Sequence, residues 1–115
     1  MGLRLTSDFY VAQLIRKING ANGFAYLVRR GALEAGTIFI MQRLKNNQID
    51  LFGPAPQSFY EEAVNDGGRL FIKILTDVEE ASAVEKLEKE LRFDPDIWLV
   101  EVENIDDLTT YINVA

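Results

Sequence analysis

Three strand-like segments in quick succession, all within residues 23–57, constrain the fold more than any other part of the chain. Segments 24–29, 37–44 and 48–52 are rich in β-branched and aromatic residues, and glycine, proline or asparagine pairs separate them. Residues 37–41 (TIFIM) are apolar on both faces of a strand. This pattern predicts a central strand that is either covered on both sides, or covered on one side and paired with a partner on the other.

Helices are expected on either side of this stretch in the sequence. Apolar residues at helical spacing predict a helix over residues 8–18, with Ser7 as its N-cap. Capping-box spacing at Thr76 and at Ser82 predicts a second helix that starts at one or the other. Shorter helices are predicted over residues 58–65 and 105–112.

Two further strands complete the expected sheet. Residues 69–75 (RLFIKIL) and 97–103 (IWLVEVE) are apolar or alternating, and neither an internal repeat nor a long linker divides the chain. We therefore expect a single globular α+β domain over residues 1–115. Its sheet would have about five strands, mostly antiparallel or mixed, with helices packed mainly on one face.

The chain lacks the residues on which much enzyme chemistry depends. It contains no cysteine and no histidine, which excludes thiol nucleophiles, Cys/His zinc sites and imidazole acid–base catalysis within the chain. No glycine-rich phosphate loop is present either. We accordingly expect no metal site, no cofactor and no catalytic residues, and favour a protein that is not an enzyme.

Charge is distributed unevenly along the sequence. Residues 1–58 hold seven basic and three acidic residues, a net charge of +4, whereas residues 59–115 hold five basic and fifteen acidic ones, a net charge of −10. This asymmetry is typical either of a basic face for an anionic partner or of an acidic helix beside a basic hairpin. The overall charge of −6 opposes nucleic-acid binding. No apolar run is long enough to span a membrane and the N-terminus lacks a signal-peptide core, so we expect a cytoplasmic protein.

One polar corner is a candidate ligand site. Arg29, Arg30 and Glu34 follow the first strand, and in an antiparallel meander the GPAPQ loop that ends at Gln57 would return to the same end of the sheet. Guanidinium groups bind carboxylates and phosphates in a bidentate manner, so this corner predicts a small-anion binding protein or an enzyme without histidine. The alternative is structural: Arg30 and Glu34 pair with each other, or the arginines hold loop carbonyls.

A protein-binding or adaptor role is the first functional hypothesis. The chain has more apolar residues than one sheet face needs, and four of them are expected opposite the core: Phe39, Met41, Phe52 and Leu99. An exposed apolar sheet face or an open edge strand would engage a protein partner or a second copy of the chain.

Several short motifs make the chain resemble a known family. They are LTSDF near the start, RRG followed by EAG and an apolar strand, GPAPQ, and RFDPD followed by a strand with tryptophan, valine and glutamate. Together they resemble an alphaproteobacterial family classified as domain of unknown function 1491, over nearly the whole chain from Arg4 to Glu103. The resemblance implies a bacterial cytoplasmic protein, and it implies no reaction and no catalytic residues.

Overall fold

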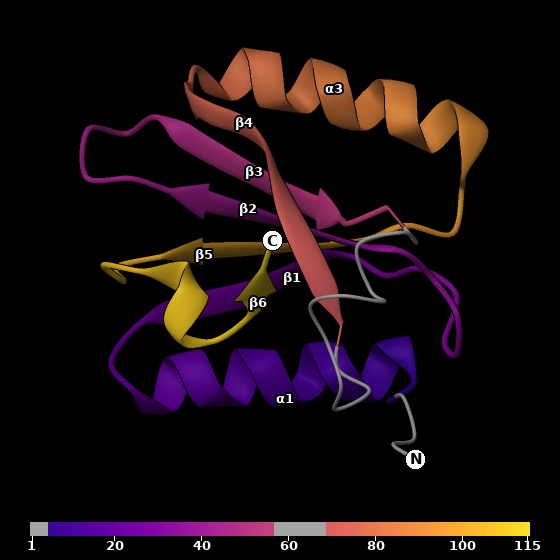
Figure 1. Cartoon of the computed structure of the whole chain (residues 1–115), viewed down its shortest axis with the longest axis horizontal. Helices are drawn as coiled ribbons and strands as arrows, with labels where there is room; N and C mark the ends of the chain where they lie inside the picture. The colour runs from indigo at the N-terminus through magenta and orange to yellow at the C-terminus, as the bar shows by residue number, and fades with distance from the viewer. Residues whose placement is uncertain (1–4, 57–68) are drawn as a thin grey trace.

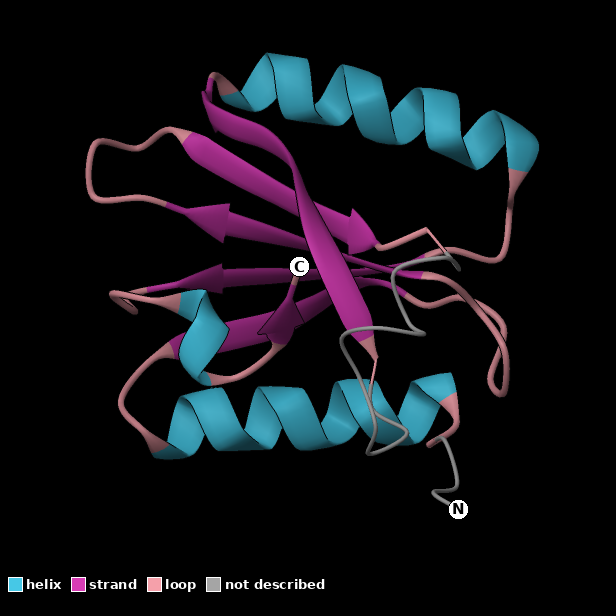
Figure 2. Ribbon diagram, in the orientation of Figure 1, coloured by secondary structure: helices cyan, strands magenta, loops and turns pink. Residues whose placement is uncertain are grey.

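A computed structural model of the chain describes residues 5–56 and 69–115. These residues form one mixed six-stranded sheet with a long helix on each face (Figures 1 and 2). The elements in chain order are α1 (Ser7–Gly20), β1 (Phe24–Arg29), β2 (Ile38–Arg43), β3 (Ile49–Pro54), β4 (Leu70–Val78), α3 (Glu80–Phe93), β5 (Trp98–Glu103), the 3-10 helix η1 (Leu108–Thr110) and β6 (Asn113–Val114).

The strand order is β1-β5-β2-β3-β4-β6. β2 pairs in parallel with β5, β4 pairs in parallel with β6, and the other neighbours are antiparallel. The expected α+β class and mixed sheet are confirmed, and β6 is an additional short strand. β5 lies between β1 and β2, because the chain crosses from β4 through α3 before it returns to the sheet.

The two long helices cover opposite faces of the sheet (Figure 1), which corrects the expectation that helices pack mainly on one face. Val11, Leu14 and Ile18 of α1 are buried against one face. Ala83 and Leu87 of α3 are buried against the other. The physical reason lies in β2, whose side chains are apolar on both faces and therefore need cover on both.

Four apolar residues that were expected on an open face are buried instead. Phe39, Met41 and Leu99 lie in the cluster beneath α3, and Phe52 lies in the cluster beneath α1. That part of the sequence interpretation is wrong for two reasons: α3 covers the face that holds Phe39, Met41 and Leu99, whereas Phe52 points to the opposite face, beneath α1.

Local boundaries differ from the sequence expectations where tertiary contacts compete with capping. Thr6, not Ser7, is the N-cap of α1, and the buried Ser7 hydroxyl donates a hydrogen bond of 2.5 Å to the carbonyl of Gly36. α3 has Glu79 at its N-cap rather than Thr76 or Ser82, because β4 continues to Val78.

The C-terminal segment is less helical than its sequence suggests. Of the expected helix over residues 105–112, only the η1 turn forms, with the Asp107 carboxylate accepting from the backbone N–H of Thr109. Its apolar residues still pack against the cluster beneath α1, as their spacing predicts. The expected helix over residues 58–65 lies outside the described residues. Among the described residues, no helix is both long and apolar enough to cross a membrane.

Candidate functional site

The two arginines of the predicted ligand corner make structural contacts. The Nη2 atom of Arg29 donates to the carbonyl of Pro95 at 2.9 Å, and the guanidinium of Arg30 lies 5.3 Å from the ring centroid of Trp98. Both contacts hold the turn that leads into β5 against the end of β1. In the described part of the chain, Arg30 and Glu34 do not form an ion pair.

Glu34 and the start of the proline loop do lie together, but with a different arginine. Glu34, Pro54 and Arg69 all line a cavity of about 360 Å³ at one end of the sheet, and neither Arg29 nor Arg30 lines it. The Nη2 atom of Arg69 donates to the carbonyl of Leu5 at 3.0 Å and to the Ser7 hydroxyl at 3.1 Å. Gln57, the fourth residue of the predicted site, lies outside the described residues.

Arg69 is a cavity residue that sequence reasoning missed. It was assigned only to the start of a strand, yet its guanidinium also lies 5.5 Å from the ring centroid of Tyr10 on α1. The sequence offered one indication: Arg69 stands between a glycine pair and an apolar strand. A cation at such a position needs polar partners from neighbouring elements.

The opposite end of the sheet carries a larger polar cleft of about 740 Å³. Asn22, Asn47 and Asn104 line it, and each has a positive φ of 70°, 71° and 61° respectively. These three residues form the turns between elements, and asparagine tolerates this backbone region better than most residues. No group of three or more acidic side chains suited to a metal ion occurs among the residues that the structure describes.

Arg43 ties β2 to β5 and α3 beside this cleft. Its Nη2 atom lies 2.6 Å from Glu80 Oε1, and its Nε atom lies 3.1 Å from Glu101 Oε2. The hydrogen bond with Glu80 is the main cause of a raised pKa at Arg43, and Glu101 adds to it. Both carboxylates therefore share one cation.

Tyr26 extends this network onto β1. It lies opposite Glu101 in the antiparallel pairing of β1 with β5. Partial burial is the largest cause of its raised pKa, followed by the hydrogen bond between its hydroxyl and Glu101. Glu101 also binds Arg43, and Arg43 in turn binds Glu80 of α3. Tyr26 therefore lies on the face of the sheet that carries α3.

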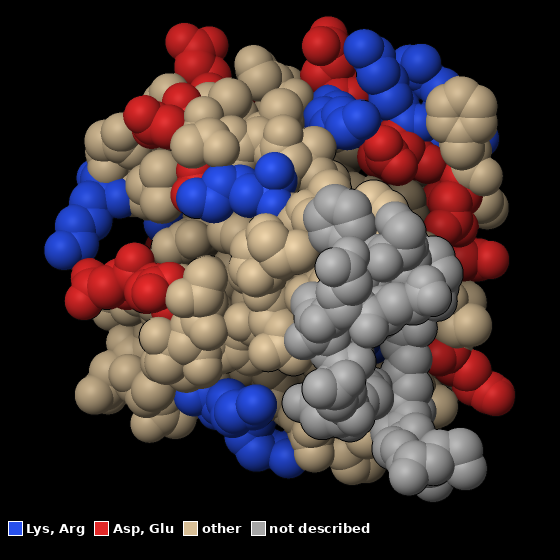
Figure 3. All heavy atoms as spheres, in the orientation of Figure 1, with Lys and Arg blue, Asp and Glu red and all other residues tan. Residues whose placement is uncertain are grey.

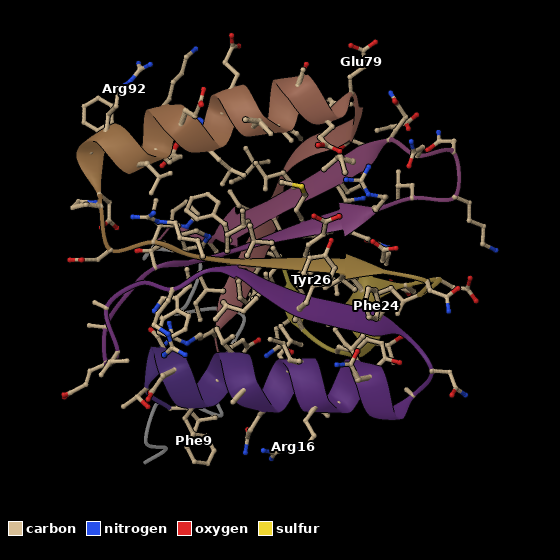
Figure 4. All side chains as sticks on the ribbon, turned by 180° about the vertical axis from the view of Figure 1, so that it is seen from behind. Phe9, Arg16, Phe24, Tyr26, Glu79 and Arg92 are labelled. Carbon is tan, nitrogen blue, oxygen red and sulfur yellow. The ribbon has the colours of Figure 1, made fainter. Side chains whose placement is uncertain are left out.

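Over β1 and the second half of β5, this face is not covered by α3. We call this part the β1–β5 face, and its residues are Phe24, Tyr26, Val28, Glu101 and Glu103. Phe24 is 54% exposed and Val28 is 50% exposed. The rings of Phe24 and Tyr26 lie 5.3 Å apart, side by side on β1 (Figure 4). α3 instead packs against β3 and β4. The described residues thus leave Phe24 and Val28 open to solvent, with the half-buried Tyr26 between them.

On the face shown in Figure 3, charge does not separate into one basic and one acidic half. Acidic and basic side chains are interspersed over α3 at the top of Figure 3, while basic side chains gather over α1 at the bottom. Lys86 and Glu90 of α3 form an ion pair at 3.1 Å, as expected for residues four positions apart on a helix. Because the strongly acidic half of the sequence forms a mixed surface on this side, its charge alone points to no ligand.

The comparisons with known proteins agree with the fold and assign no activity. A model of the family described as "Protein of unknown function (DUF1491)" matches residues 5–111. The solution structure of protein Atu0922 from A. tumefaciens is similar, with 40% identity, a TM-score of 0.84, and coverage of 98% of this chain and 96% of that one.

Two structures of DUF1491 family proteins from Caulobacter crescentus are also similar. The crystal structure has 26% identity and a TM-score of 0.77, and the match covers 98% of this chain and 99% of that one. The NMR structure has 28% identity and a TM-score of 0.75, and the match covers 99% of each chain. No curated protein matches the chain. Since the family model covers nearly the whole sequence, the chain belongs to the DUF1491 family of proteins of unknown function.

Proposed function

We propose that this protein is a protein-binding module and that the β1–β5 face is its binding surface. The observation that carries the proposal is the aromatic pair of Phe24 and Tyr26 on a part of the sheet that no described helix covers. Aromatic side chains supply much of the binding energy at protein interfaces, because they bury a large area and lose little conformational entropy. Single exposed apolar residues are ordinary, whereas two exposed ones, Phe24 and Val28, on either side of a half-buried tyrosine form a continuous surface.

The acidic residues around this surface support a partner with basic residues. Glu101 and Glu103 of β5 lie opposite Tyr26 and Phe24 respectively in the strand pairing. Arg43 is the only cation paired with Glu101 in the described residues, and it is shared with Glu80. The apolar surface therefore has an acidic border. A complementary partner segment would present apolar side chains flanked by lysine or arginine.

Site-specific photo-crosslinking in cell extract tests this function. A photoreactive phenylalanine analogue at position 24 should cross-link to a discrete protein, and mass spectrometry should find the linked peptide to contain apolar residues next to lysine or arginine. The matched control is the same analogue at Phe93, which is 90% exposed but lies at the end of α3. No adduct from position 24, or an identical set of adducts from both positions, would overturn the proposal.

Binding of a small carboxylate or phosphate is a second candidate function, favoured by the cavity that Glu34, Pro54 and Arg69 line. Here Arg69 takes the anion-binding role that the sequence suggested for Arg29 and Arg30. Thermal unfolding against a panel of organic acids and phosphorylated metabolites tests it, since a ligand at a hundred times its Kd adds about 2.7 kcal/mol. A shift that persists in Arg30→Ala but is lost in Arg69→Lys supports the cavity; no shift with any ligand contradicts it.

A further inference from the structure

The edge of β1 is closed to an added strand. The Asn19 side chain at the end of α1 binds both backbone groups of Ala25: its Oδ1 accepts from the N–H at 2.8 Å, and its Nδ2 donates to the carbonyl at 3.1 Å. A bulge between Leu27 and Arg29 interrupts the strand further along. Native proteins use such devices to prevent strand pairing at sheet edges. A partner on the β1–β5 face therefore docks on the face of the sheet, not along its edge.

The space left on that face has the width of one helix. α3 packs on β3 and β4, and the cluster beneath it includes β2 and Leu99, so the uncovered strip consists of β1 and the Glu101–Glu103 part of β5. Neighbouring strands lie about 4.8 Å apart, and packed helices lie about 8–10 Å apart. The midpoint of β1 and β5 lies three strand spacings, about 14 Å, from the midpoint of β3 and β4, so a helix placed over β1 and β5 would fit on this face without a clash with α3.

The spacing of the apolar side chains along β1 also matches a helix. Phe24, Tyr26 and Val28 are two positions apart, which is about 6.7 Å per step along a strand. Residues four positions apart on a helix are separated by about 6 Å along the axis. A helix with apolar residues at i, i+4 and i+8 would therefore contact all three side chains in register.

The acidic border fixes the charge of this helix. Glu101 is already bound to Arg43, but Glu103 has no ion pair in the part of the chain that the structure describes. We infer that the partner segment is a basic amphipathic α-helix, which lies over β5 and β1 on the same side of the sheet as α3. This inference rests on the proposed function, whose surface it shares.

An NMR titration of the full chain with designed peptides tests the inference. The probe is a peptide of about 18 residues, long enough to form a helix, with leucines along one face and lysines beside them. The controls have the same composition, either scrambled or rearranged to alternate leucine and lysine as a strand does. We expect saturable shifts of the Phe24–Val28 and Glu101–Glu103 amides with the helical peptide, and weaker effects with both controls.

Two outcomes would overturn the helix. One is the absence of shifts on the β1–β5 face up to a peptide concentration of about 1 mM, the weak end of specific binding. The other is equal binding of the alternating peptide. Phe24→Ser should weaken binding about tenfold or more, as for a central interface aromatic, while Phe93→Ser should leave it unchanged. Cross-links from position 24 without preferential binding of the helical peptide would reject the helix and retain the binding surface; failure of both would reject both.

Discussion

The two faces of the sheet are covered to different extents. On one face, α1 packs against the sheet, and Leu108 and Ile112 of the C-terminal segment are buried in the same cluster. On the other face, α3 packs on β3 and β4, and its cluster extends across β2 to Leu99 of β5 and to Ile97 just before that strand. A six-stranded sheet is wider than one helix, so a face with a single helix leaves strands uncovered. The open strip over β1 and β5 is thus a direct consequence of the architecture.

β1 shows the same contrast within one strand. Ala25, on the closed face, is buried, while Phe24 beside it is more than half exposed. A strand with one solvated face usually directs its larger apolar residues toward the core. Here Ala25 faces the core and the larger Phe24 faces solvent, so core packing does not account for Phe24.

The sharpest test of this contrast compares two strand valines with the same chemistry. Val102 of β5 is 0% exposed beneath α1, and Val28 of β1 is half exposed. Val102→Ala should lower the free energy of unfolding by about 2–3 kcal/mol, through lost burial and a residual cavity. Val28→Ala should cost less than about 1 kcal/mol.

Urea unfolding midpoints at an unchanged m-value measure both effects. Equal costs at the two positions would mean that the β1–β5 face is as closed as the opposite face. In that case the free protein would already cover Val28, and the proposed binding surface would lose its basis.

The edge of β1 offers the next largest effect. Asn19→Ala removes the two hydrogen bonds that the Asn19 side chain makes with the N–H and the carbonyl of Ala25. We therefore expect the free energy of unfolding to fall by about 1–2 kcal/mol. We also expect concentration-dependent association, because the edge becomes able to pair with a second copy. Gln13→Ala on the same helix is the control. Sedimentation that stays monomeric at every concentration in Asn19→Ala would show that the bulge alone protects the edge.

The sequence was sufficient for the fold class and for the elements with strong periodicity. β2 is apolar on both faces, and its interpretation as a strand covered on both sides is confirmed. The placement of α3 was not predictable, because helical periodicity shows that a helix has an apolar stripe but not which face of the sheet receives it. Phe39, Met41 and Leu99 were therefore assigned to an open face that α3 in fact covers.

The candidate site was predicted less well, for a related reason. Arg29, Arg30 and Glu34 are close in sequence, yet only Glu34 reaches the cavity, and Arg69 enters it from β4. Contacts between residues so far apart depend on strand order, which local patterns do not encode. The exposure of Phe24 has the same origin: an alternating strand reveals two faces, and only the packed structure shows which one α1 occupies.

The smallest expected effect concerns Tyr26 and measures how far the β1–β5 face is already shielded from solvent. Partial burial, followed by the hydrogen bond to Glu101, raises the pKa of Tyr26 above its ordinary value near 10. A raised pKa contributes stability that is fully present below the ordinary value and is lost as the pH rises through the folded one. Tyr26→Phe removes this contribution, so its stability should fall less steeply than that of the parent protein above pH 10. Urea midpoints from neutral to alkaline pH measure the difference, and parallel curves would show that Tyr26 is as solvated in the folded chain as in the unfolded one.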